Sequence, residues 1–281
     1  LLANGLNVLL TYLLVFGRLG LPALGIEGAA LGTVLSQVVG AGTYLWVFLR
    51  RRTDRQYATR RPQAPDWQLL RRILRVGLPM GMWWVLEMGG FTVFTMFVST
   101  LGQVELAGHQ IVRQMVHLSF LPGVALGVAA TTLVGQYLGA GDPASAERSA
   151  RNAIRIALVI MASMGLLFVV LRYPLARLFN HDERVVAIAA RLFLFAAVFQ
   201  TFDALGTVAS GAVRGAGDTR WPMVVSLLMS WLVFVPAVLL LGKVAGLGVY
   251  GAWTGATFHI SVLGLLLYGR FRGGKWKYMK I

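Results

Sequence analysis

Eight long apolar stretches constrain the fold of this sequence more than any other feature. Most approach or exceed the roughly 20 residues that an α-helix needs to cross the hydrocarbon core of a bilayer, and they lack the strict alternation of barrel strands. Only 13% of the residues are charged and 57% are hydrophobic, whereas about a quarter of a soluble domain is charged. The sequence predicts an all-α integral membrane protein with eight transmembrane helices, at residues 1–17, 28–49, 76–101, 109–138, 152–171, 185–213, 221–242 and 246–269.

Arginine and lysine gather in alternate connections between these helices. They are abundant in the long connection 50–75, in 139–151, in 214–220 and in the C-terminal tail, and sparse in the remaining connections. Because basic loops stay in the cytoplasm, we expect a multi-pass protein of the plasma (bacterial inner) membrane with a cytoplasmic C-terminus. The formal charge of +15 then indicates contact with anionic membrane lipid rather than with nucleic acid. Residues 67–75 are expected to form an amphipathic helix lying in the interface.

An internal repeat divides the chain. The motif Gly25-Ile-Glu-Gly-Ala-Ala30 and the helices on either side of it resemble Gly248-Val-Tyr-Gly-Ala-Trp253 and its flanking helices. Repeats of this size are typical of transporters built from two related bundles. We therefore expect residues 1–49 to be the last two helices of an N-terminal lobe, 50–75 a basic cytoplasmic linker, and 76–281 a six-helix C-terminal lobe.

The start of the chain fits this division. It opens at Leu1 inside an apolar helix and lacks the pattern of a signal peptide. If the repeat unit has six helices, four helices of the first lobe are missing. We therefore expect an N-terminally truncated sequence.

Two carboxylates lie deep in the expected spans. Glu87 is about 16 Å along its helix, close to the bilayer midplane, and Asp203 lies nearer the cytoplasmic end of its own helix. Such residues are costly in a membrane and usually face a bundle interior or a water-filled cavity. They predict one shared cation-coupling site, and the alternative is a pair of hydrogen-bonded groups that fix helix packing. Candidate ligands for a cation, drawn from the same helices, are Thr92, Thr95, Gln200, Thr201 and Thr207.

Two other features of these helices suggest a substrate path. Aromatic and methionine residues crowd the Glu87 helix, and Trp84, Met88, Phe91 and Phe94 are candidates for an apolar wall that contacts bulky organic cations. Pro79 and Pro122 interrupt two spans and are expected to bend them. Lipid contact and ordinary helix packing are the alternatives for these residues.

The sequence gives little support for an enzymatic active site or a metal site. The chain has no cysteine, its scattered histidines lack the spacing of metal ligands, and no phosphate-binding loop, dinucleotide fingerprint or nucleophile elbow occurs. We interpret His109, His117 and His259 as interface or packing residues. No catalytic residue, metal site or cofactor is expected, apart from Na⁺ or H⁺ as a coupling ion.

Several motifs together resemble the multidrug and toxic compound extrusion (MATE) transporters, in particular the NorM-like bacterial branch. The similarity covers nearly the whole chain and is carried by Gly77-Leu-Pro-Met with Glu87, Leu106-Ala-Gly-His-Gln-Ile111, Pro122-Gly-Val-Ala-Leu-Gly-Val-Ala, Val134-Gly-Gln-Tyr-Leu-Gly-Ala-Gly-Asp142, and Phe202-Asp203 with Gly211-Ala-Val-Arg-Gly-Ala-Gly-Asp-Thr-Arg220. The resemblance implies a twelve-helix, two-lobed antiporter that is monomeric when full length. It also implies that Glu87 and Asp203 bind the coupling cation.

The expected function is secondary antiport, in which cationic or amphipathic drugs leave the cell in exchange for Na⁺ or H⁺. A lipid-linked saccharide flippase of the same superfamily is an alternative. Its pyrophosphate substrate favours several cavity-lining cations, whereas few arginines, among them Arg113 and Arg191, lie near helices rather than in loops. A membrane scaffold or inactive fragment without transport of its own is the alternative from another class, and a membrane enzyme ranks third.

Overall fold

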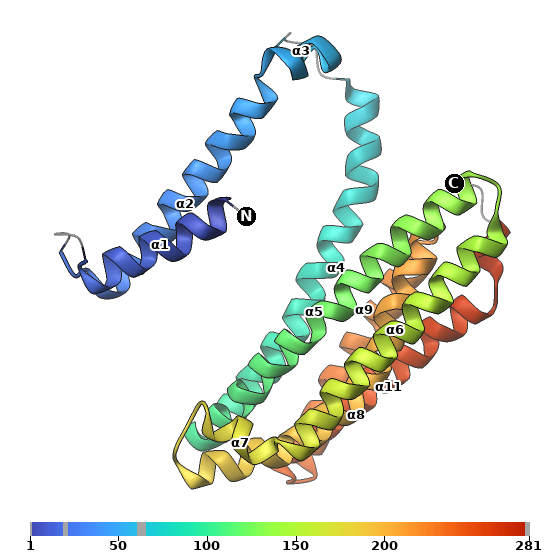
Figure 1. Cartoon of the computed structure of the whole chain (residues 1–281). Helices are drawn as coiled ribbons and strands as arrows, with labels where there is room; N and C mark the ends of the chain where they lie inside the picture. Colours follow the sequence, from blue (N-terminus) through green and yellow to red (C-terminus); the bar gives the residue numbers. More distant parts are fainter. Residues whose placement is uncertain (1, 19–21, 61–65, 279–281) are drawn as a thin grey trace. The chain divides into compact units, whose positions relative to one another are not determined.

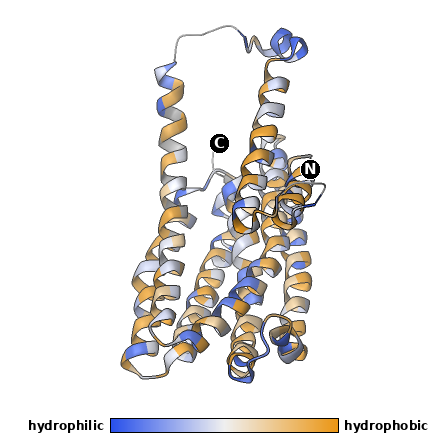
Figure 2. Cartoon of the chain, turned by 90° about the vertical axis from the view of Figure 1, so that its left-hand side faces the viewer, coloured by the Kyte–Doolittle hydropathy of each residue, from blue (hydrophilic) through white to orange (hydrophobic). Residues whose placement is uncertain are grey.

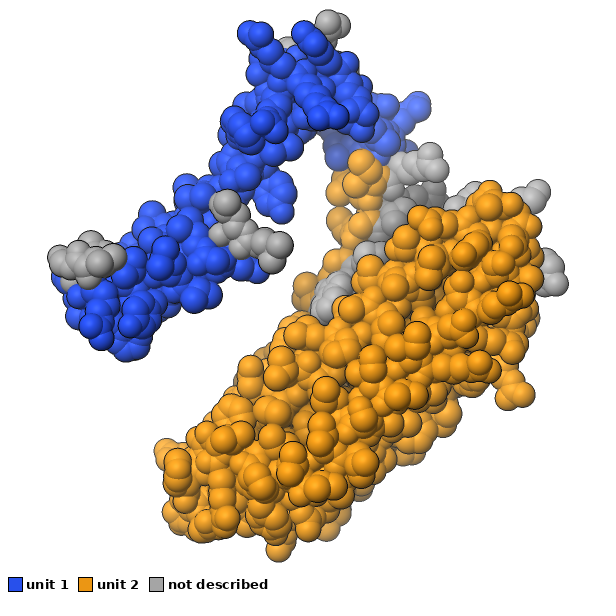
Figure 3. Space-filling view, in the orientation of Figure 1, with its two compact units in different colours: residues 1–72 blue, residues 73–281 orange. Residues whose placement is uncertain are grey.

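The computed structural model describes residues 2–18, 22–60 and 66–278. Within these ranges some side chains fall outside the described structure: Leu2, Arg72, Arg75, Val76, Pro79, Met80, Trp83, Trp84, Glu87 and Tyr278. All regular structure in the described ranges is helical, as the apolar stretches predict. The chain divides into two compact units, unit 1 (Leu1–Arg72) and unit 2 (Ile73–Ile281) (Figure 3).

Unit 1 contains a helical hairpin followed by a short helix. α1 (Leu2–Phe16) packs along α2 (Gly25–Phe48), and α3 (Arg51–Tyr57) follows in the polar connection. Side-chain hydrogen bonds join the hairpin, because Asn7 Nδ2 donates to the hydroxyls of Thr33 (3.3 Å) and Ser36 (3.1 Å). Few side chains of α2 are buried, so this apolar helix presents most of its surface outward within its own unit.

Unit 2 is a helix bundle built around α8 (Glu183–Gly215). α8 packs against α5 (Gln103–Gly139), α6 (Pro143–Val170) and α11 (Gly248–Arg272), which run side by side in Figure 1. The other helical segments of this unit are α4 (Trp67–Ser99), which begins in unit 1, α7 (Arg172–Arg177), α9 (Arg220–Leu228), η1 (Met229–Phe234), α10 (Val235–Leu239), η2 (Leu240–Val244) and η3 (Lys275–Tyr278).

Small residues let α8 approach its neighbours closely. A Cβ atom added to Gly211 would lie 2.3 Å from the carbonyl oxygen of Gly127 on α5, and one added to Gly215 would lie 2.3 Å from that of Thr131. The Thr131 hydroxyl also donates across this contact to the Gly211 carbonyl oxygen at 2.8 Å. In a bilayer, where apolar burial between helices gives little driving force, such backbone approach and interhelical hydrogen bonding stabilise the association.

The repeat predicted from sequence has matching local geometry in its two copies. α2 begins at Gly25 with φ of +54°, and α11 begins at Gly248 with φ of +57°. This left-handed conformation favours glycine because it has no Cβ. Both motifs therefore use their first glycine for the same backbone turn into the helix.

The second glycine of each motif serves close packing. A Cβ added to Gly28 would lie 2.5 Å from the carbonyl oxygen of Leu14 on the preceding helix, and one added to Gly251 would lie 2.3 Å from that of Leu241. Each glycine thus permits its helix to cross the end of the helix before it. The two hairpins agree at both glycines.

Each predicted span coincides with helical structure, but not all of them meet the criteria for a crossing helix. Six described segments are long and apolar enough: Gly25–Phe48, Gln103–Gly139, Pro143–Val170, Glu183–Gly215, Arg220–Val244 and Gly248–Arg272. In α1 and α4 the apolar parts are shorter, Ala3–Phe16 and Met88–Ser99. Figure 2 shows hydrophobic residues along much of the long helices and hydrophilic residues in α3. The count of eight transmembrane helices stays a prediction.

Two details of the predicted helices were wrong. Residues 67–75 do not form a separate interfacial helix, because α4 runs from Trp67 to Ser99 and the Gly77-Leu-Pro sequence does not end it. Residues 220–244 are not a regular α-helix, because η1 and η2 are π-helical and flank Pro236. Proline has no N–H and its ring crowds the carbonyl four residues earlier, so a locally wider turn accommodates it.

A buried ion pair closes the turn after α8. Asp218 has a side chain that is only 6% exposed, and its Oδ2 accepts from Nη2 (2.7 Å) and Nε (2.9 Å) of Arg270 at the end of α11. The guanidinium also lies 5.3 Å from the ring centroid of Trp221. Asp218 therefore links the turn after α8 to the end of α11.

Candidate functional site

Asp203 lies in the middle part of α8 and its side chain is half-buried within unit 2. The Thr207 hydroxyl, one turn further along, donates to Asp203 Oδ1 at 3.4 Å. Gln200 precedes Asp203 by three residues, and spacings of three and four place side chains on one helix face. Two of the predicted cation ligands therefore share a face of the central helix with Asp203.

Gln200 is fully buried and has one unused acceptor. Its Nε2 donates to the hydroxyl of Ser119 on α5, which donates in turn to the Val116 carbonyl oxygen at 2.9 Å. The Oε1 atom of Gln200 has no hydrogen-bond partner among the described residues. Buried acceptors are nearly always paired. An unpaired oxygen three residues from a carboxylate is the kind of group that a proton donor or a cation satisfies.

Glu87 lies on α4, but its side chain is outside the described residues. Its neighbours show what α4 packs against at this level. Trp231 Nε1 on η1 donates to the Leu86 carbonyl oxygen at 3.2 Å, and a Cβ on Gly90 would lie 3.4 Å from the Phe234 ring. This part of α4 therefore contacts η1. The shared site of Glu87 and Asp203 stays a prediction.

The remaining candidate ligands lie in different surroundings. Thr92 and Thr95 donate to carbonyl oxygens of their own helix, those of Met88 (2.8 Å) and Phe91 (3.0 Å), and Thr201 is half-buried on α8. A hydroxyl has two lone pairs besides its hydrogen, so an intrahelical bond does not use the acceptor capacity of either threonine.

The predicted substrate wall is only partly within the described structure. Met88 and Phe91 are exposed within unit 2, 59% and 37% respectively, whereas Phe94 is buried in the core. The side chain of Trp84 lies outside the described residues, as does that of Pro79. Pro122 lies inside α5, which continues through it.

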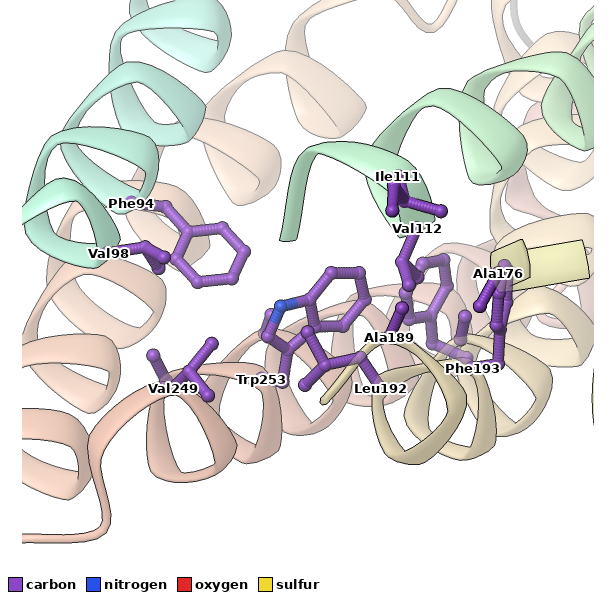
Figure 4. Close-up of a cluster of buried hydrophobic side chains, with 14 of the residues drawn as sticks. Phe94, Val98, Ile111, Val112, Ala176, Ala189, Leu192, Phe193, Val249 and Trp253 are labelled. Carbon is purple, nitrogen blue, oxygen red and sulfur yellow. The ribbon is translucent and has the colours of Figure 1, made fainter. Parts of the chain in front are cut away.

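A buried polar network joins three helices near the turn between α4 and α5. Trp253 Nε1 on α11 donates to His109 Nδ1 on α5 at 3.2 Å, and His109 Nε2 lies 3.3 Å from the Thr95 hydroxyl on α4. Figure 4 shows Trp253 within the surrounding apolar cluster, together with Phe94 and Leu192. The Phe94 ring meets His109 edge-on, with ring centroids 4.8 Å apart.

The hydrogen-bond donors in this network determine which ring nitrogen of His109 carries the proton. An indole N–H can only donate, so His109 Nδ1 must accept and the neutral ring carries its proton on Nε2. That proton is then donated to Thr95, whose own hydroxyl proton goes to the Phe91 carbonyl oxygen. Hydrogen bonds therefore run in one direction, from α11 through α5 to α4.

Replacing Trp253 with Phe is expected to lower the free energy of unfolding by about 1–3 kcal/mol, because His109 Nδ1 is left buried without a donor. The measurement is thermal unfolding of the purified chain in detergent. Trp231→Phe is the matched control, since that indole donates at the same distance of 3.2 Å but to a helix carbonyl near the exposed surface. Equal losses for the two variants would argue against a stabilising role of the network.

The sequence indicated no such role for His109. It was interpreted as a packing or interface residue, and its partner Trp253 is 144 residues away. Only the fold brings the two together. Among the described residues no group of three or more histidine and acidic side chains is placed to hold a metal ion.

Comparison with known proteins places these features in context. The model of the MatE family matches residues 79–239, more than half of the chain. The "Probable multidrug resistance protein NorM" of Thermotoga maritima is 32% identical over 277 residues, which are 98% of this chain and 59% of the relative. The "Multidrug resistance protein MdtK" of Yersinia enterocolitica is 34% identical over 271 residues, 95% of this chain and 59% of the relative. The chain therefore spans about three-fifths of the length of these relatives.

Solved structures share the fold. One is described as the outward-facing conformation of a multidrug resistance MATE family transporter and matches with a TM-score of 0.82 at 22% identity, covering 99% of this chain and 62% of that one. The corresponding inward-facing structure matches with a TM-score of 0.76 at 22% identity, covering all of this chain and 64% of that one.

Proposed function

Because this chain belongs to the MatE family of membrane transporters, we propose that it forms part of a secondary antiporter that exports cationic or amphipathic compounds in exchange for Na⁺ or H⁺. Residues 1–49 are the end of a first lobe in this proposal, and 76–281 are the second lobe. The complete protein is a monomer of the bacterial inner membrane with its C-terminus in the cytoplasm. Small organic cations and membrane lipid are its partners.

The observation that carries the proposal is the polar face of α8. Asp203 is half-buried on α8, which packs against α5, α6 and α11, with the Thr207 hydroxyl beside it and the unpaired Oε1 of Gln200 one turn away. Carboxylate, hydroxyl and amide oxygens suit a hard cation such as Na⁺. A carboxylate in an apolar bundle is equally suited to take up a proton, because burial favours its neutral form.

Exchange follows if the cation and the drug favour different conformations of the same lobe. A ligand shifts a conformational equilibrium only by its difference in affinity for the two states. Neutralising Asp203 by a cation removes a buried charge and so stabilises a conformation in which this face is closed. An organic cation instead favours the conformation in which the face is open and charged. Each ligand then drives the release of the other, as alternating access requires.

The test is efflux of a fluorescent organic cation, ethidium, from vesicles that contain the complete product of the gene encoding this chain. A Na⁺ gradient and a pH gradient are imposed separately. We expect efflux under one gradient and little under the other, which identifies the coupling ion. Correctly inserted protein that moves ethidium under neither gradient would favour a scaffold without transport.

A further inference from the structure

One face of α6 has a basic end. Arg148, Arg151 and Arg155 are exposed in its first turns and, together with Asn152 and Ala144, line a shallow cavity of about 350 Å³. The carboxylate of Glu147 also lines this cavity. Spacings of three, four and seven residues place the three guanidinium groups along one side of the helix.

The acidic groups nearby are already engaged. Glu147 forms ion pairs with Arg151 and with Lys277 of η3. Asp142 is the N-cap of α6 and accepts from the Ser145 backbone N–H at 2.9 Å, and this hydrogen bonding holds the pKa of its carboxyl below the usual value. Within the described chain neither Arg148 nor Arg155 forms a salt bridge. The cavity is therefore positively charged.

The same face of α6 turns apolar directly beyond the arginines. Val159 is 72% exposed and Leu166 is 63% exposed, and their spacing from Arg155 keeps them on the arginine side of the helix. α6 is also long and apolar enough to cross a membrane. A strip of exposed guanidinium groups thus continues into a strip of exposed hydrocarbon.

We propose that this face of α6 binds an anionic phospholipid. Guanidinium groups hold phosphate oxygens through paired, charge-assisted hydrogen bonds, so Arg148 and Arg155 bind the headgroup phosphate and Arg151 contributes charge. The acyl chains lie along Val159 and Leu166. A soluble anion would leave the apolar strip uncovered, whereas the acyl chains of a lipid contact it. The ligand is therefore a lipid. The proposal does not depend on the transport function.

The experiment counts lipids bound to the purified 281-residue chain in neutral detergent by native mass spectrometry, with phosphatidylglycerol or phosphatidylcholine added. We expect phosphatidylglycerol to be retained preferentially. The variant R148Q/R151Q/R155Q is expected to bind it about a hundred-fold more weakly, since each arginine near a membrane surface contributes roughly a five-fold factor. The control R51Q/R52Q/R55Q removes the same charge from the exposed α3 and is expected to weaken binding much less.

A lysine variant and a competition with phosphate complete the experiment. The variant R148K/R151K/R155K keeps the charge and is expected to retain binding at reduced affinity, so it tests the site even if the glutamine variant does not fold. Inorganic phosphate is added as a competitor and is expected not to displace the lipid. Displacement by phosphate, equal retention of phosphatidylcholine, or equal losses in the α6 and α3 variants would each overturn the proposal.

Discussion

Replacing Asp203 with Asn is expected to reduce ion-coupled efflux by the complete protein to the level of empty vesicles, while the protein remains folded and inserted. The amide has nearly the shape of the carboxylate and can still accept from the Thr207 hydroxyl. It can neither take up a proton near neutral pH nor supply the negative charge that draws a cation out of water. The measurement is ethidium efflux under whichever gradient drives the wild-type protein.

Glu183→Gln is the matched control for this substitution. It neutralises a carboxylate on the same helix, but at the first residue of α8, where the side chain is 72% exposed and pairs with Arg177. Surface pairs of this kind contribute little, so efflux should be unchanged. Full ion-dependent efflux by the Asp203→Asn protein would rule out Asp203 as a coupling residue and leave it a structural group.

Glu87→Gln extends the same test to the second predicted carboxylate. If Glu87 and Asp203 share one cation, either substitution alone should abolish coupling, and combining the two should add nothing further. Independent partial losses that add in the double variant would indicate two separate sites. The comparison therefore tests the pairing without requiring the position of the Glu87 side chain.

The sequence was sufficient for the helices and the repeat because both depend on local patterns. Apolar runs of membrane length predicted the long helices, and the similar motifs that begin at Gly25 and Gly248 predicted a repeat, whose two copies begin at φ of +54° and +57°. The π-helical segments around Pro236 were missed because proline indicates a distortion without specifying whether a helix bends, widens or ends.

The features that the sequence did not predict depend on contacts between helices that are far apart in the chain. Asp203 was identified from its charge and depth, yet the unpaired Gln200 oxygen beside it depends on where Ser119 lies on another helix. The pairing of Asp218 was not predicted, because its partner Arg270 follows 52 residues later. His109 appeared unremarkable for the same reason. Polar residues acquire these roles from tertiary neighbours, which spacing along one helix does not reveal.

Replacing Gly211 with Ala is expected to destabilise the bundle by at least about 3 kcal/mol, at the upper end of the usual cost of overpacking. The added methyl group would lie 2.3 Å from the carbonyl oxygen and 2.9 Å from the carbonyl carbon of Gly127. Both are backbone atoms of α5, so no flexible side chain can move aside and the two helices must separate. Separation also breaks the hydrogen bond from Thr131 to the Gly211 carbonyl oxygen. Thermal unfolding in detergent measures the loss.

Gly269→Ala is the control that makes the sign of this effect informative. Gly269 lies in α11 with no atom within 4 Å of its added Cβ, so alanine there should stabilise the helix by up to about 1 kcal/mol through its higher helix propensity. The same substitution should thus act in opposite directions at the two positions. If Gly211→Ala also stabilised the protein, α5 and α8 would not be in backbone contact. The close approach of α5 to the helix that carries Asp203 would then be wrong.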